Sequence, residues 1–265
     1  MSAVLERQES FSTVTELPGK GASPDALLML ATRYAVAGEL APGGDVLEVA
    51  CGGGMGLGHL LRVSNTVTAG DFDPAMVEVV NKYYEKRLVA QRLDAMNLDF
   101  ADASFDCVLL LEAIYFVPDA ARAVSEAFRV LRPGGKFMIA APNPLFVSFN
   151  AAPYSTKYFS PLEFKKLLED HGFSAETLCG FPEEGGGLKT KVLNVVRKLA
   201  VTFRLIPDTM EGKERIKKLI YGELPPFPNE VVVDPAKVET PVPTDSVGDI
   251  SKYRVLYAIG TKPLA

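Results

Sequence analysis

The chain contains no tryptophan, only two histidines and only three cysteines in 265 residues. The cysteines, Cys51, Cys107 and Cys179, are odd in number and lie in apolar, strand-like segments, which argues against a disulfide framework or a zinc site. We expect reduced, buried thiols in a cytoplasmic protein that binds no metal. His59 is expected to pack or face solvent and His171 to lie at a helix end, so a histidine base is disfavoured.

A surplus of basic residues and a long apolar run are also missing. The net charge of −5 argues against a nucleic-acid partner, because proteins that bind nucleic acids usually carry a basic surface. No segment approaches the roughly 18 apolar residues that span a bilayer. Residues 1–20 show no basic segment followed by an apolar one, so no signal peptide is expected. One domain over residues 1–265 is predicted, with an N-terminal arm and helix at 1–38.

Apolar runs alternate with helical periods along most of the chain. Several runs are apolar without alternation, which is typical of parallel strands buried on both faces. The pattern predicts an α/β fold with a doubly wound, seven-stranded, mostly parallel sheet covered by helices. The predicted strands are 45–51, 66–72, 90–95, 104–111, 136–142, 174–181 and 252–262, and the predicted helices are 23–38, 55–63, 73–88, 119–132 and 160–173.

Glycine occupies five of the seven positions from Gly52 to Gly58, directly after the first predicted strand. Glycine suits neither strands nor helices, so its concentration here predicts that a ligand approaches the backbone closely. Loops at the carboxyl ends of parallel strands are where such sheets bind cofactors. The dinucleotide fingerprint fails, because Leu57 or His59 stands where its last glycine is required, and no Gly-Lys-Ser/Thr of a phosphate-binding loop follows.

An acidic residue near the end of the first strand precedes these glycines. Glu48 is followed by Gly52, Gly54 and Gly56 in a Gly-x-Gly-x-Gly spacing, and further acidic residues follow the second and third strands. Together with the segments 108–117 and 130–139, this pattern resembles the class I S-adenosylmethionine-dependent methyltransferases over residues 40–180 and again at the last strand. Ala50 stands where that family usually has glycine, a departure that is expected to tighten the turn slightly.

The resemblance implies S-adenosylmethionine as the cofactor and gives the acidic residues roles. Asp71 would hold both ribose hydroxyls, and Asp94 would contact the adenine amino group. A Cβ within the glycine loop would collide with the amino-acid end of the cofactor. Glu48 would either stabilise the loop through its amides or contact that amino-acid end, directly or through water. The complete implied cofactor-binding set is Glu48, Ala50, Gly52, Gly54, Asp71, Phe72, Asp94, Ala95, Met96 and Glu112.

Glu112 and Tyr115, beyond the fourth strand, are the candidate catalytic residues, because they are expected to project toward the transferred methyl group. The other interpretation of both is a packing or lid contact. Methyl transfer from a sulfonium is an in-line displacement for which the cofactor supplies the activated group. The protein therefore contributes mainly by aligning the acceptor and excluding water, and a general base is optional.

Two further segments are predicted to surround the acceptor. The loop after the fifth strand is predicted to form a wall of the acceptor pocket; it carries Asn143, Phe146, Phe149, Asn150, Tyr154 and Tyr158. An insertion at 182–250 carries an apolar stripe at helical spacing from Leu188 to Ile206, beside basic residues. The stripe is predicted to cover the pocket or pack on its own domain, and the alternative is a membrane-surface helix that takes up lipid-soluble substrates.

The sequence therefore predicts methyl transfer from S-adenosylmethionine to a small-molecule acceptor. One alternative is methylation of a lipid or quinone at a membrane surface. Another is a non-catalytic module that binds S-adenosylmethionine. Nucleic-acid methylation is disfavoured, because the chain has neither a base-flipping motif nor an overall basic charge.

Overall fold

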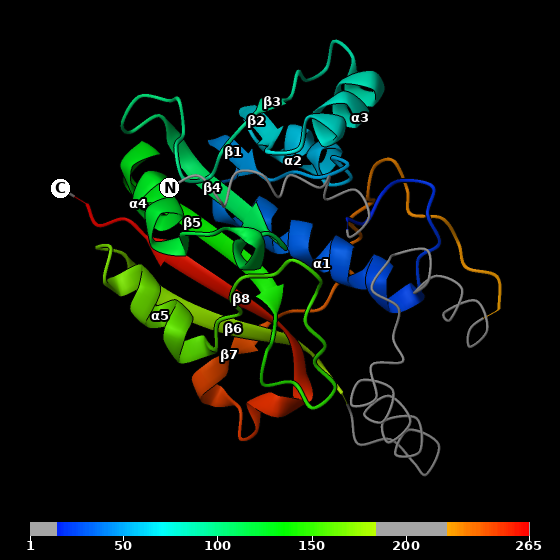
Figure 1. The fold of residues 1–265 in the computed structure, drawn as a ribbon, viewed down its shortest axis with the longest axis vertical. Helices are drawn as coiled ribbons and strands as arrows, with labels where there is room; N and C mark the ends of the chain where they lie inside the picture. The colour runs from blue at the N-terminus through cyan, green and yellow to red at the C-terminus, as the bar shows by residue number, and fades with distance from the viewer. Residues whose placement is uncertain (1–14, 184–221, 265) are drawn as a thin grey trace.

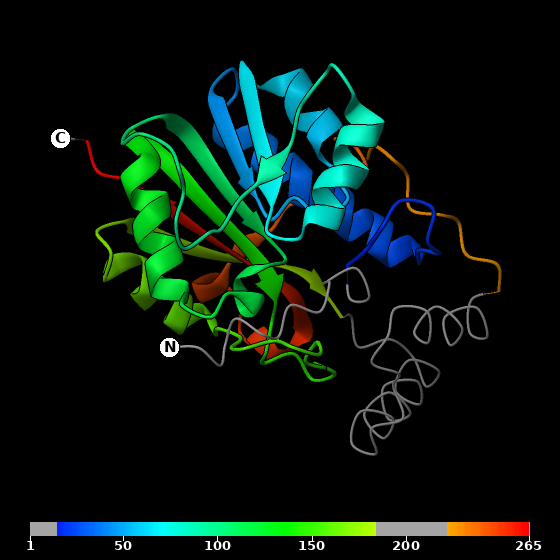
Figure 2. The same ribbon diagram turned by 45° about the horizontal axis from the view of Figure 1, so that its top comes forward.

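The computed structural model describes residues 15–183 and 222–264. One sheet runs through the middle of the molecule with helices against both of its faces (Figure 1 and Figure 2). Its strand order is β3-β2-β1-β4-β5-β8-β6-β7. The strands are β1 (Asp45–Val49), β2 (Thr66–Asp71), β3 (Gln91–Arg92), β4 (Phe105–Leu111), β5 (Leu131–Pro142), β6 (Ser174–Pro182), β7 (Val242–Pro243) and β8 (Tyr253–Thr261).

The sheet is parallel from β3 to β5, and β8 runs antiparallel between β5 and β6. The predicted doubly wound, mostly parallel sheet is confirmed. The structure adds β7, a two-residue strand that pairs with β6 at Leu178 and Cys179 and lies in the segment predicted as an insertion. β5 begins at Leu131, earlier than predicted, because Leu131 already pairs with Phe105 before a register shift in the ladder.

The helices are α1 (Pro24–Leu40), α2 (Leu57–Val63), α3 (Pro74–Tyr84), α4 (Ala120–Val130) and α5 (Pro161–Glu169). Three of them begin with the same arrangement, in which a polar N-cap precedes a proline. The side chains of Ser23, Asp73 and Ser160 each accept a backbone N–H from the first turn. Such caps satisfy amides that have no partner within the helix, so the sequence itself sets these helix starts.

Two hydrophobic cores lie on opposite faces of the sheet. One packs α1, α2 and α3 against β1, β2 and β4, and the other packs α4 and α5 against β1, β4 and β5. Within β4, Cys107 and Leu109 face the first core and Val108 and Leu110 face the second. This alternation explains the unbroken apolar run from Cys107 to Leu111, because all of these positions are buried on one face of the sheet or the other. All three cysteines are free and buried, as predicted.

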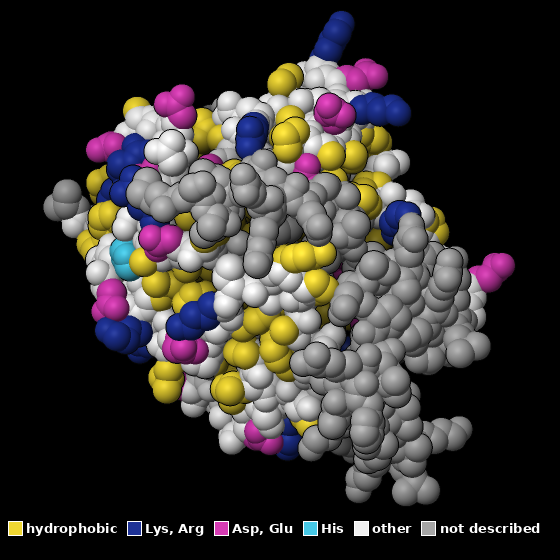
Figure 3. Space-filling view, viewed as in Figure 1, with side chains coloured by type: hydrophobic (Ala, Val, Ile, Leu, Met, Phe, Trp, Pro, Cys, Tyr) yellow, Lys and Arg dark blue, Asp and Glu magenta, His cyan; other side chains and the backbone are white. Residues whose placement is uncertain are grey.

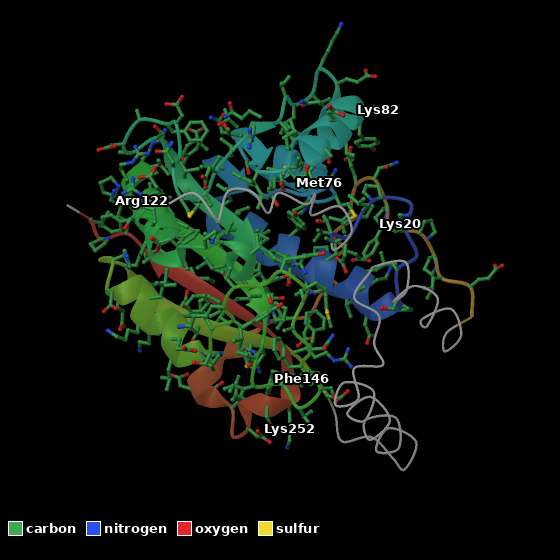
Figure 4. All side chains as sticks on the ribbon, in the orientation of Figure 1. Lys20, Met76, Lys82, Arg122, Phe146 and Lys252 are labelled. Carbon is green, nitrogen blue, oxygen red and sulfur yellow. The ribbon has the colours of Figure 1, made fainter. Side chains whose placement is uncertain are left out.

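The N-terminal arm and the segment that returns before β7 lie side by side (Figure 1). Gly21 and Pro226 form an antiparallel bridge, and backbone hydrogen bonds join Gly19 and Lys20 to Phe227. The return segment then crosses α2, where the Val231 amide donates to the Met55 carbonyl at 2.7 Å. Figure 4 shows Lys20 beside this segment, far from Arg122 on α4. Segments more than 200 positions apart thus meet beside the glycine loop.

The apolar stripe from Leu188 to Ile206, predicted to cover the acceptor pocket, lies outside the described residues. Within the parts that the structure describes, no helix is long and apolar enough to cross a membrane.

Candidate active site

Four of the predicted acidic residues follow one another along a single edge of the sheet. Glu48 lies in β1, Asp71 ends β2, Asp94 follows β3 and Glu112 follows β4. The order β3-β2-β1-β4 makes these strands neighbours, and they run parallel. Their carboxyl ends therefore meet, which brings together side chains that are up to 64 positions apart in the sequence.

Asp71 is held by backbone amides on both sides of its carboxylate. Its Oδ2 accepts the Gly52 amide at 2.8 Å, and its Oδ1 accepts the Asp73 amide at 2.9 Å. Burial raises the pKa of Asp71, and these backbone hydrogen bonds oppose that shift. Each carboxylate oxygen has about two acceptor positions, so each can still accept one hydroxyl. That capacity suits a ligand with two neighbouring hydroxyl groups.

The residues around Asp94 form a tight turn beyond β3. Asp94 Oδ1 accepts the Met96 amide at 2.9 Å, which leaves Oδ2 as a further acceptor. Ala95 packs against the second core. Phe72, directly after β2, has the guanidinium carbon of Arg92 5.1 Å from its ring centroid. This part of the site offers a carboxylate and an aromatic face.

Glu48 is buried, with 1% of its surface exposed. Tyr34 from α1 donates its hydroxyl to Glu48 Oε1 at 2.6 Å. Glu48 Oε2 is buried and has no hydrogen-bond partner among the described atoms. Burial raises the pKa of Glu48 to about 7, although the Tyr34 hydrogen bond and the nearby Arg33 charge oppose the shift. A buried carboxylate oxygen without a partner is costly, and this oxygen could accept a hydrogen bond from a ligand.

The glycines of the loop face other parts of the protein as well, and the close approach of a ligand to their backbone stays a prediction. A Cβ at Gly54 would lie 2.9 Å from Val80 Cγ2, and one at Gly56 would lie 1.8 Å from Tyr34 Cζ. A Cβ at Gly53 would lie 2.7 Å from Pro18 Cδ in the arm. Gly52 and Gly54 also have φ angles of +53° and +73°, a region that glycine adopts readily. The loop is glycine-rich because α1, α3 and the arm pack directly on it.

Ala50 has a φ angle of +59°, in the left-handed region. This explains why a glycine is usual at the position, and it gives a prediction. Ala50→Gly should raise the free energy of unfolding by about 0.5–1 kcal/mol, because an L-residue in this region costs about 1–2 kcal/mol and glycine entropy offsets part of the gain. Urea denaturation of both proteins measures the difference. A less stable Ala50→Gly variant would contradict the role given to this angle.

Glu112 is the centre of a cluster that extends from β4 to α1. Arg33 Nη2 donates to Glu112 Oε1 at 3.1 Å, and the Tyr115 hydroxyl donates to Glu112 Oε2 at 3.0 Å. The φ angle of Glu112 is +55°, a strained conformation for a non-glycine residue of the kind that clusters at functional sites. Burial and Glu112 raise the pKa of Tyr115 well above its usual value, so the Tyr115 hydroxyl keeps its proton at neutral pH.

Two aromatic residues of the loop after β5 extend this cluster. Tyr158 stacks on Tyr115 with ring centroids 4.6 Å apart, and Phe149 meets Tyr158 edge-on at 4.7 Å. Asn143 has a different role from the one predicted, because its side chain is fully buried. Its Nδ2 donates to the Ile250 and Tyr253 carbonyls, and its Oδ1 accepts the Leu145 amide. Phe146 lies near Lys252, below the end of β5 (Figure 4). The structure thus brings part of the predicted aromatic wall to the site.

Both histidines contact structural elements of the fold. His59 packs against α1, where a Cβ at Gly38 would lie 2.8 Å from His59 Nε2. His171 Nδ1 lies 2.7 Å from the Leu167 carbonyl at the end of α5.

Arg33, Tyr34 and Tyr84 are site residues that the sequence did not predict. Tyr84 spans the glycine loop, accepting from the Gly58 amide and donating to the Gly54 carbonyl, both at 2.8 Å.

Comparison with known proteins finds methyltransferases among the similar proteins. Residues 47–139 match the family model described as a methyltransferase domain. A probable S-adenosylmethionine-dependent methyltransferase of Mycolicibacterium smegmatis is 37% identical over 142 residues, covering 52% of this chain and 55% of that protein. A phthiotriol/phenolphthiotriol dimycocerosates methyltransferase of Mycobacterium tuberculosis is 41% identical over 143 residues, covering 52% and 50%. The chain therefore spans about half the length of the curated relatives it matches.

Residues 47–139 are thus similar to a methyltransferase domain, and the relatives matched over about half of this chain are named S-adenosylmethionine-dependent methyltransferases. The solved structure of YcgJ from Bacillus subtilis shares the fold of this chain, with a TM-score of 0.56, 17% identity, and coverage of 90% of this chain and 99% of that one. The resemblance to S-adenosylmethionine-dependent methyltransferases found in the sequence is confirmed, and the names of these relatives imply S-adenosylmethionine as the cofactor.

The residues present fit that cofactor. Its ribose carries two neighbouring hydroxyls, which Asp71 can accept, and its ammonium requires an acceptor such as the unpartnered Glu48 Oε2. Neither the ribose nor the ammonium group requires a phosphate-binding loop, which the sequence lacks. The methyltransferase domain therefore presents an acidic edge suited to a ligand with a positively charged end.

Proposed function

We propose that this protein transfers the methyl group of S-adenosylmethionine to a small-molecule acceptor bound between Glu112, Tyr115 and the aromatic residues after β5. The observation that carries the proposal is the Glu112 cluster at the same sheet edge as Glu48 and Asp71. The proposed cofactor-binding residues Glu48 and Asp71 and the proposed proton acceptor Glu112 thus lie along the same edge. We also propose that residues 1–265 form a single methyltransferase domain with an insertion at 182–250.

In this proposal the cofactor residues keep the roles that the resemblance implies. Asp71 holds the ribose and Asp94 the adenine amino group, and Phe72, Ala95 and Met96 belong to the same cofactor-binding set. Gly52 and Gly54 shape the loop, and Ala50 turns the chain out of β1. When bound, S-adenosylmethionine supplies an electrophilic methyl group on a sulfonium.

Glu112 is the proposed proton acceptor for the methylated group. Tyr115 is a poor base because its raised pKa keeps it protonated, so its hydroxyl instead orients the Glu112 carboxylate. Arg33 holds the other carboxylate oxygen at 3.1 Å, which fixes the Glu112 side chain in position. The stacked Tyr115 and Tyr158 rings offer a flat apolar surface for an acceptor. Alignment against this surface and exclusion of water supply the remaining rate acceleration.

Acceptor screening with S-adenosylhomocysteine release as the readout tests the proposal. With an acceptor found, Glu112→Gln should lower kcat by about 10²–10⁴-fold for a hydroxyl acceptor, the usual contribution of a general base. Tyr115→Phe should lower it less, because the carboxylate remains. Binding of S-adenosylhomocysteine should stay within a few-fold of wild type in Tyr115→Phe. Unchanged turnover in Glu112→Gln would contradict a role for Glu112 as a base. Alignment of the acceptor would then be the remaining catalytic contribution.

One observation favours the second candidate, methylation of an acceptor with a long apolar part. The loop after β5 exposes Leu145 and Val147 to solvent at 47% and 50%, and Figure 3 shows hydrophobic side chains gathered on the face that this loop occupies. The M. tuberculosis relative is named for phthiotriol and phenolphthiotriol dimycocerosates. The screen should therefore include acceptors dispersed in anionic vesicles. Turnover only with vesicles, abolished by Leu145→Asp, would select this candidate over a free small molecule.

A further inference from the structure

Gly58, the last glycine of the loop, lies against a residue from a distant part of the chain. A Cβ at Gly58 would overlap the carboxylate of Glu230. Glu230 belongs to the return segment, residues 222–241, which is drawn in orange in Figure 1. In the same segment, the Val231 amide donates to the Met55 carbonyl at 2.7 Å. The return segment therefore requires a residue without a side chain at position 58.

Glu230 is held in this place by two arginines, one on α2 and one after α3. Arg62 Nη1 lies 3.4 Å from Glu230 Oε2, and Arg87 Nη2 pairs with Glu230 Oε1. The Glu230 side chain is 19% exposed, whereas both arginines are about half exposed. The hydrogen bond from Arg87 lowers the pKa of Glu230 against the opposing effect of burial, so the carboxylate stays ionised at neutral pH. A single, largely buried carboxylate thus joins the return segment to α2 and to the end of α3.

Arg87 connects this ion pair to Tyr84, the last residue of α3. The guanidinium carbon of Arg87 lies 4.7 Å from the Tyr84 ring centroid, a distance at which a cation is attracted to the ring face. The Tyr84 hydroxyl accepts the Gly58 amide and donates to the Gly54 carbonyl, both at 2.8 Å. Gly56 is the N-cap of α2 and has no side chain that could accept an amide of the first turn. Tyr84 supplies that acceptor, and it thereby fixes the loop where it enters α2.

Building on the proposed function, in which the glycine loop binds S-adenosylmethionine, we propose that Glu230 is a positioning residue for this loop. Its carboxylate keeps the Arg87 guanidinium over the Tyr84 ring, and the Tyr84 hydroxyl keeps the loop in its observed shape. Without that carboxylate Tyr84 loses part of its cover, and the loop spends less time in this shape. A site that is competent for only part of the time binds its ligand more weakly by that fraction. The return segment thus contributes to cofactor affinity from the side of the loop that faces α3.

Calorimetry with S-adenosylhomocysteine tests the route from Glu230 through Tyr84. Glu230→Gln should weaken binding about threefold to tenfold, since each contact with a half-exposed arginine is worth no more than about fivefold. Tyr84→Phe, which removes both loop hydrogen bonds, should weaken binding at least as much. The double variant should stay within about twofold of Tyr84→Phe, because the two residues act in series. The dissociation constant of a fully folded protein does not depend on global stability, so a merely structural role would leave it unchanged.

Asp234→Asn is the matched control, because it removes a carboxylate of the same return segment, one that pairs with Lys237 at 3.0 Å. Its affinity for S-adenosylhomocysteine should stay within about twofold of wild type. An unchanged affinity in Glu230→Gln would overturn the positioning role. Losses from Glu230→Gln and Tyr84→Phe that multiply in the double variant would overturn it as well.

Hydrogen exchange of the cofactor-free protein measures the same loop without any ligand. The Gly58 amide, which bonds to Tyr84, should exchange about threefold to tenfold faster in Glu230→Gln and at the wild-type rate in Asp234→Asn. An unchanged rate in Glu230→Gln would overturn the proposal even if Tyr84→Phe does not fold. A wild-type protein that fails to bind S-adenosylhomocysteine would instead overturn the proposed function, and the exchange rate of Gly58 would still decide whether Glu230 holds the loop.

Discussion

Asp71→Asn should weaken binding of S-adenosylhomocysteine by about tenfold to hundredfold. The substitution removes the charge from an acceptor that is proposed to hold both ribose hydroxyls, and hydrogen bonds to charged groups contribute about 1.5–3 kcal/mol each. It also turns one amide NH₂ toward a backbone N–H, at Gly52 or at Asp73, where two donors would meet. Isothermal titration of both proteins gives the ratio of the dissociation constants.

Asp73→Asn is the control for that experiment. It makes the same chemical change two positions along the chain, at the N-cap of α3, where asparagine caps as well as aspartate does. Its affinity for S-adenosylhomocysteine should remain within about twofold of wild type, since RT ln 2 is only about 0.4 kcal/mol. Preferential binding of NAD(H) by the wild-type protein, or an unchanged affinity in Asp71→Asn, would refute the ribose assignment.

Gly56→Ala should destabilise the protein by about 1–3 kcal/mol even without cofactor, the usual range for overpacking a filled core. The new Cβ would fall 1.8 Å from the Tyr34 ring, which is 5% exposed and has little space into which it can move. Displacing the ring also breaks the hydrogen bond between Tyr34 and Glu48, so cofactor affinity should fall as well. Urea denaturation of the cofactor-free protein measures the first effect and calorimetry the second.

Gly248→Ala serves as the comparison, because no heavy atom lies within 4 Å of a Cβ at that position. Its free energy of unfolding should change by no more than about 0.5 kcal/mol. The pair of variants separates two explanations of the glycine loop. A Gly56→Ala protein that is as stable as wild type without cofactor, but binds it poorly, would show that the ligand rather than Tyr34 requires the glycine.

The sequence predicted the fold well because its determinants are local. Unbroken apolar runs mark strands buried on both faces, and the caps at Ser23, Asp73 and Ser160 mark helix starts within a few residues. The order of strand, glycine loop and acidic residue is likewise local, and it carries the family resemblance that implied the cofactor. The two-residue strand β7 escaped prediction because so short a segment has no periodicity of its own and pairs only by contact with β6.

The sequence by itself determined the sheet, the cofactor class and which acidic residues lie at the strand ends, since each depends on a pattern within a few neighbouring residues. Only the tertiary structure decided why the loop is glycine-rich, because Tyr34, Val80 and Pro18 reach it from three separate segments. It alone also brought Arg33 to Glu112 across 79 positions. The sequence around Arg33 gives no local sign of its partner, and the packing of α1 on the sheet is what places this largely buried cation against the Glu112 carboxylate.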